Sequence, residues 1–98
     1  MTFKLSFHRE ARKEARDALL FYREIDPALA AEFLEIYESA IAQILAVPLG
    51  CAVVIGQARS KGLRKYPYTI FYRFDTSEVR IIALAHQKRR PEYWLNRT

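Results

Sequence analysis

The sequence predicts an α+β domain in which a strand and a helical hairpin pack on a small antiparallel sheet, in the order β-α-α-β-β-β. Apolar and polar residues alternate at the start of the chain and again over its last third, which indicates strands. Between these segments, apolar residues recur at three- and four-residue spacing, which indicates helices. The length of 98 residues suits one domain spanning residues 1–98.

The first strand is expected over residues 3–7, where Phe3, Leu5 and Phe7 face one way. An amphipathic helix is expected over residues 8–25, because small and apolar residues form a stripe along one side of it. The positions of this stripe are Ala11, Ala15, Ala18, Leu19, Tyr22 and Ile25.

An Asp-Pro pair separates the first helix from a second one. Asp26 can cap a helix N-terminus, and Pro27 suits the first helical position, where no amide hydrogen is needed. The second helix is expected to run to about residue 46, before Pro48 and Gly50 end it. Two helices joined by so short a turn should form an antiparallel hairpin.

The rest of the chain is expected to form an antiparallel meander. Residues 52–55 could form a short edge strand or simply cover the core. A strand is expected near residues 58–65, with Gly62 as a candidate bulge, and another over residues 69–74. The turn at residues 75–77 leads into the last strand.

The last strand, expected over residues 79–86, is apolar on both faces. We expect it to lie inside the sheet, with other elements packed on each side. Strict alternation assigns one face to Val79, Ile81, Ala83 and Ala85, and the other to Ile82 and Leu84.

Charge is unevenly distributed along the chain, whose net charge is +5. Residues 1–58 carry six basic and eight acidic residues, a balance of −2, whereas residues 59–98 carry ten basic and three acidic residues, a balance of +7. A basic half of this kind is expected to have an acidic partner, either nucleic acid or an acidic protein segment.

We expect neither a metal nor another cofactor. Cys51 is the only cysteine, which excludes a cysteine cluster or an intrachain disulfide, and His8 and His86 are the only histidines. No apolar run approaches the ~18 residues of a membrane span, and the alternating start does not resemble a signal peptide. These features lead us to expect a cytoplasmic location.

Two C-terminal segments resemble those of ParE-like toxins. Residues 63–72, LRKYPYTIFY, resemble the R-x-F-P-Y-x-I-x-Y segment, and residues 81–94, IIALAHQKRRPEYW, resemble the closing I-x-A-x-x-H-x-x-R-x-P-x-Y-W segment. The helix pair opened by Asp26-Pro27 is also similar to this group. The chain thus resembles the RelE/ParE superfamily of type II toxin–antitoxin toxins, closer to the ParE-like branch.

The resemblance implies a toxin that a cognate antitoxin protein binds and neutralises as a hetero-oligomer. ParE-like members inhibit DNA gyrase by protein–protein contact, which is the activity we expect. The alternative is the RelE-like activity, metal-free cleavage of messenger RNA on the ribosome, and a third reading is a non-toxic relative that only binds its antitoxin. The motif residues with expected structural roles are Pro67, Tyr68, His86, Pro91, Tyr93 and Trp94.

A nuclease would have to draw its catalytic groups from Arg64, Lys65, Arg89 and Tyr93. Two arginines of RelE-like proteins are missing, because Thr69 stands in place of one and the His86–Lys88 stretch in place of the other. We therefore expect a binding protein rather than an enzyme.

Basic residues from two segments are expected to meet on the sheet and form a surface for the target or the antitoxin. We expect His86 to hydrogen-bond to the tail, and Trp94 either to close the core or to anchor a partner. The residues of the expected binding surface are Arg64, Lys65, Arg73, Lys88, Arg89 and Arg90.

Overall fold

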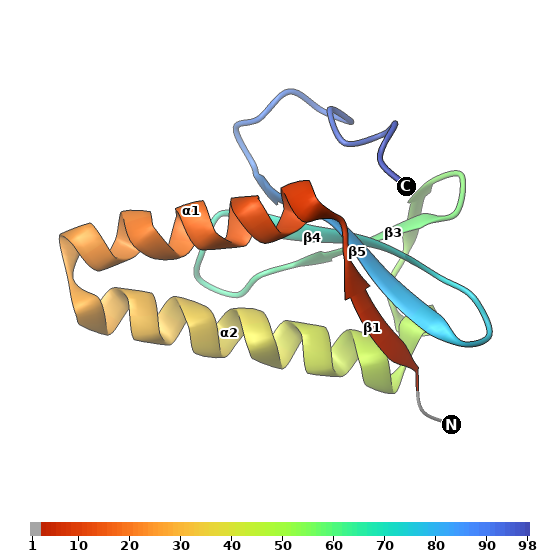
Figure 1. Ribbon diagram of the computed structural model, residues 1–98, viewed down its shortest axis with the longest axis horizontal. Coiled ribbons are helices and arrows are strands. Elements are labelled where there is room, and N and C mark those ends of the chain that lie inside the picture. The colour runs from red at the N-terminus through yellow and green to blue at the C-terminus, as the bar shows by residue number, and fades with distance from the viewer. Residues whose placement is uncertain (1–2) are drawn as a thin grey trace.

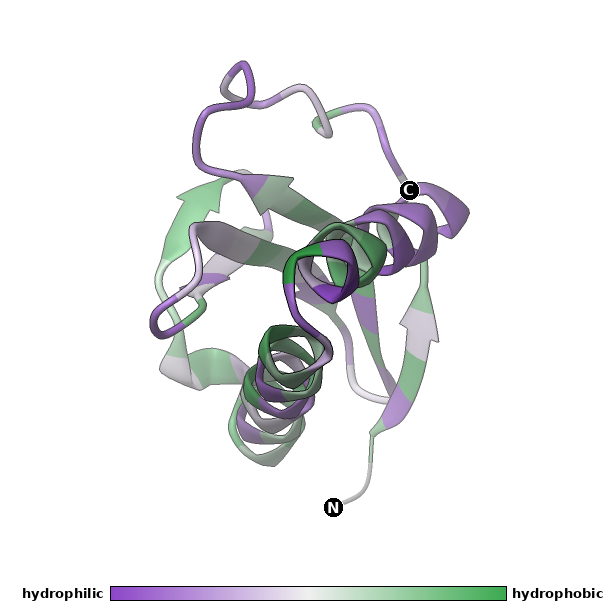
Figure 2. Cartoon of the chain, turned by 90° about the vertical axis from the view of Figure 1, so that its left-hand side faces the viewer, coloured by the Kyte–Doolittle hydropathy of each residue, from purple (hydrophilic) through white to green (hydrophobic). Residues whose placement is uncertain are grey.

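The computed structural model describes residues 3–98, with two helices on one face of a five-stranded sheet and the C-terminal tail on the other (Figure 1). Seen from the end of the hairpin, α2 and the tail lie on opposite sides of the sheet (Figure 2). The elements in chain order are β1 (Lys4–Phe7), α1 (Arg9–Ile25), α2 (Pro27–Ala46), the 3₁₀ turn η1 (Pro48–Gly50), β2 (Val53–Ile55), β3 (Ala58–Gly62), β4 (Tyr68–Phe74) and β5 (Glu78–His86).

The helical hairpin begins and turns at the residues that the sequence indicates. Nδ1 of His8 accepts a hydrogen bond from the Glu10 amide at the start of α1, 3.0 Å away. Asp26 Oδ1 accepts from the Ala28 amide at 2.9 Å, so this carboxylate caps α2, and Pro27 takes the first helical position. The predicted antiparallel hairpin is confirmed (Figure 1).

The sheet is mixed, which corrects the expectation of a purely antiparallel one. Its strand order is β1-β5-β4-β3-β2, and β1 pairs in parallel with β5, from Lys4 opposite Glu78 to Phe7 opposite Ile81. A parallel pair needs a long connection, and here the whole hairpin and three strands lie between its two members. The other neighbouring strands pair antiparallel.

Residues 53–55 form the short edge strand that was one of the two alternatives. The expected bulge at Gly62 was wrong, because Gly62 pairs in regular register with Thr69. Gly62 is instead the last residue of β3, which stops short of the expected residue 65.

A bulge occurs in β5, for which the sequence predicts regular alternation. Phe71 pairs with Ala83 while the next residue, Tyr72, pairs with Ile81, so Ile82 has no partner of its own on β4. The extra residue shifts the side-chain period by one position. Consequently Leu84, not Ala83, joins Ile81 in the core beneath the helices, which overturns the predicted assignment of faces.

Two cores lie on the two faces of the sheet, so β5 is the interior strand that the sequence predicts. The larger core joins the helical hairpin to the sheet and includes fully buried Phe33, Ile44, Ile70 and Tyr72. The smaller one lies beneath the tail and consists of Ala58, Ile82, Ala83 and Trp94. Within residues 3–98, no helix is long and apolar enough to cross a membrane.

Candidate functional site

The chain turns sharply where β5 ends, and His86 holds this turn. Its Nδ1 accepts a hydrogen bond from the amide of Lys88 at 3.0 Å, and its carbonyl accepts from the amide of Arg89 at 2.9 Å. The edge of the ring also meets Tyr68, with the two centroids 5.1 Å apart. The expected hydrogen bond between His86 and the tail is therefore present.

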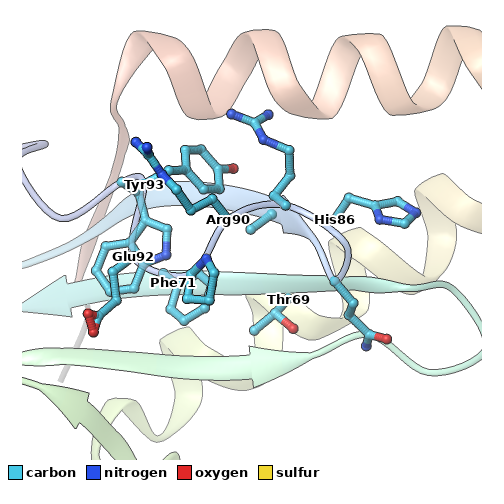
Figure 3. A pocket seen from close by; sticks show the side chains of 11 residues that line it. Thr69, Phe71, His86, Arg90, Glu92 and Tyr93 are labelled. Atoms are coloured by element: carbon cyan, nitrogen blue, oxygen red, sulfur yellow. The ribbon is translucent and has the colours of Figure 1, made fainter.

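A cavity of about 260 Å³ separates the tail from the outer face of β4 and β5 (Figure 3). The indole of Trp94 lies in the wall, stacked on Phe71 at 4.3 Å between ring centroids, and Trp94 is only 2% exposed. Trp94 thus closes the core. Pro91 also lines the cavity, where the chain folds back toward the sheet, and Arg90 and Thr69 contribute polar groups to it (Figure 3).

A single carboxylate on α1 holds the tail. Glu14 Oε2 accepts a hydrogen bond from the Tyr93 hydroxyl at 2.6 Å. Both terminal nitrogens of Arg97 donate to the same carboxylate, at 2.8 and 3.0 Å, which gives a bidentate ion pair. Glu14 also accepts from the Leu84 amide at 3.0 Å, next to the bulge and beyond the end of β1.

The arrangement around Tyr93 is unfavourable for acid–base chemistry. Burial and the hydrogen bond to Glu14 raise the pKa of the Tyr93 hydroxyl well above its usual value. The guanidinium of Arg89 lies over the ring, with its central carbon 3.9 Å from the ring centroid. The hydroxyl is thus committed to a structural contact.

Glu14 and Arg97 are residues that sequence reasoning missed. A signal for Glu14 was present, because a residue three positions after Ala11 and four before Ala18 falls at the edge of the buried alanine stripe. A carboxylate at such a position needs a partner. No comparable pattern marks Arg97 near the end of the chain.

Arg64 and Lys65 lie against α2, and the residues that they contact there do not include Tyr93. Lys65 forms an ion pair with Glu32 at 2.7 Å, and the Tyr66 hydroxyl donates to the same carboxylate at 2.7 Å. The hydrogen bonds from Lys65 and Tyr66 lower the pKa of Glu32. Arg64 lines a groove beside α2.

The two basic segments meet through their backbones but not through their charged groups. The amide of Gln87 donates to the carbonyl of Pro67 at 2.9 Å, so both loops lie at the same end of the sheet. Pro67 directly precedes β4, where Tyr68 is the first residue, as expected for residues that set the start of a strand. Beyond this contact, Arg64 lines a groove beside α2, whereas the guanidinium of Arg89 lies over the Tyr93 ring.

Arg73 lies apart from the other residues of the expected binding surface. Its Nη1 donates to the carbonyl of Arg97 at 2.8 Å, and its side chain borders a hollow with Asp75 and Glu78 at the opposite end of β4. The reason is positional, because Arg73 faces the tail side of the sheet and the tail ends there. Lys88, Arg89 and Arg90 remain exposed.

These features define an α+β domain with a helical hairpin, a mixed sheet and an anchored C-terminal tail. Residues 5–91 match the model of the family described as ParE toxin of type II toxin-antitoxin system, parDE. The chain therefore belongs to the ParE toxin family, and it is a toxin of a type II toxin–antitoxin system. Tyr93 and Arg97 lie beyond the matched residues.

A similar fold occurs in a solved chain described as the chromosomal ParDE TA system from P. aeruginosa. The two superpose with a TM-score of 0.75 at 16% sequence identity, over 87% of this chain and 96% of that one. At this identity the likeness concerns the fold alone. No match was found among curated proteins.

Proposed function

We propose that this toxin arrests growth by binding a bacterial target, DNA gyrase, rather than by cleaving RNA. One observation carries this choice over the RelE-like alternative: the Tyr93 hydroxyl is bonded to Glu14 and its pKa is raised. The other groups that a nuclease would use are divided, with Arg64 and Lys65 beside α2 and Arg89 stacked on Tyr93. Gyrase as the target rests on the resemblance to ParE-like toxins.

We also infer that a cognate antitoxin neutralises the toxin in a protein complex. Phe21 and Ile25, four residues apart on α1, are each 59% exposed, which is unusual for large apolar side chains and suits an amphipathic partner helix. The edge strand β2 exposes Val53 and Val54, and an extended segment of the antitoxin could pair along it.

A supercoiling assay with purified gyrase tests the target. Micromolar toxin is expected to reduce supercoiling, and an equimolar amount of the antitoxin encoded beside it is expected to restore the activity. Heat-unfolded toxin is the control for nonspecific inhibition. Normal supercoiling at micromolar toxin, with growth arrest still seen when the toxin is expressed in cells, would exclude gyrase as the target.

A further inference from the structure

The outer face of α1 carries a row of basic side chains, all of them exposed. At 3.6 residues per turn they fall within a sector of roughly 100°, opposite the buried side of the helix, and extend over about 21 Å of its length. Figure 2 shows α1 as the more hydrophilic helix of the pair. This α1 basic stripe consists of Arg9, Arg12, Lys13, Arg16 and Arg23.

The acidic residues of α1 lie beside the stripe rather than within it. Glu10, Asp17 and Glu24 are displaced to one side of the helix, and Glu14 is turned toward the tail. The net charge of residues 1–58 does not reveal the stripe, because the acidic residues of both helices outnumber its cations. The folded helix separates the two signs.

Most of the stripe is available to a partner. Within residues 3–98, Arg9, Arg16 and Arg23 form no ion pair and no side-chain hydrogen bond. Lys13 pairs with Asp17 at 3.5 Å, an exposed contact of little energetic value, and Arg12 covers the Phe7 ring. The contrast with the sheet is clear, because Arg73 and Arg80 there donate hydrogen bonds to carbonyls of the tail.

The composition of the stripe indicates the kind of partner. The centres of protein–protein interfaces are apolar and depleted in charge, whereas protein–DNA interfaces are polar and strongly basic. Leu20 is the one apolar residue in the sector, since the exposed Phe21 and Ile25 point to a different side of the helix. Four of the five cations are arginines, whose guanidinium groups match phosphate oxygens in pairs.

We propose that the α1 basic stripe binds the sugar–phosphate backbone of duplex DNA without sequence preference. A duplex presents a rigid, regular row of phosphates to a straight, rigid row of cations. Single strands are bound through aromatic side chains on which bases stack, and the stripe has none. The proposed contact is independent of gyrase and would exist in the isolated toxin.

Fluorescence anisotropy with a labelled duplex of about 20 base pairs tests the proposal, with salt varied from about 50 to 200 mM. The variant R9Q/R16Q/R23Q is expected to bind roughly tenfold more weakly, and the slope of log K against log salt should fall by about 2.7, or 0.9 for each lost phosphate contact. Glutamine preserves helix propensity, and replacing the same three arginines with lysine, which keeps the charges, should leave the salt slope nearly unchanged.

The matched control is R64Q/K88Q/R90Q, which removes the same charge from exposed positions at the end of the sheet. It is expected to weaken duplex binding less than threefold. Equal weakening by both triple variants would overturn the proposal, because net charge alone would then account for binding. It is overturned as well if the unchanged toxin binds no duplex at about 50 mM salt, or prefers single-stranded RNA or polyglutamate.

Discussion

Replacing Glu14 with glutamine is expected to lower the free energy of unfolding by about 3–5 kcal/mol, because it leaves the charge of Arg97 without its partner in a largely buried place. The two side chains are 14% and 15% exposed, so solvent screens them little. The same carboxylate accepts from Tyr93 and from the Leu84 amide, and these bonds weaken when the acceptor loses its charge. Urea denaturation measures the effect.

Two variants control this experiment. E10Q removes an exposed carboxylate from the same helix and is expected to change stability by no more than about 0.5 kcal/mol. Glu14→Gln combined with Arg97→Met removes both charges, and we expect it to recover a substantial part of the loss. A stability of E14Q within about 0.5 kcal/mol of the unchanged protein would refute the role assigned to Glu14.

Replacing Trp94 with alanine is expected to cost about 3–5 kcal/mol of unfolding free energy. The indole is almost fully buried against Phe71, and few other large side chains cover this face of the sheet. Its loss would leave a cavity between the tail and the bulge of β5. Thermal and urea denaturation should both show the decrease.

The neighbouring residue supplies the control for Trp94. Leu95 is exposed, so Leu95→Ala is expected to cost less than about 1 kcal/mol. In the unchanged protein Trp94 is the only tryptophan, and its fluorescence should shift to longer wavelength in a single step with unfolding. A small effect of Trp94→Ala, or a fluorescence transition well before global unfolding, would mean that the tail is not part of the cooperative structure.

Local signals in the sequence were enough to predict the helical hairpin. The pairing of strands that are distant in the sequence could not be predicted from such signals. Asp26 and Pro27 act on the residues next to them, so their spacing alone locates the turn between the helices. The parallel pairing of β1 depends on where the chain returns some seventy residues later. The bulge at Ile82 likewise depends on the register with β4, and apolar residues on both faces of β5 conceal the shift.

The candidate site was predicted in part for the same reason. His86 interacts with the turn that follows it, and Trp94 stacks on Phe71 of β4. The structural roles of both motif residues could therefore be predicted from their positions in the sequence. Arg64 and Lys65 lie beside the acidic side of α2, where Lys65 pairs with Glu32, a residue more than thirty positions earlier in the sequence. The role of Arg97 depends on Glu14, which is still more distant in the sequence.

Primer extension on translated messages tests the central claim, that this toxin acts by binding and that Tyr93 is structural. The account predicts no new ribosome-dependent cleavage sites in cells arrested by the toxin. Any growth effect of Tyr93→Phe should then follow its loss of stability alone. Cleavage within ribosome-bound messages that disappears in a correctly folded Tyr93→Phe variant would contradict the account.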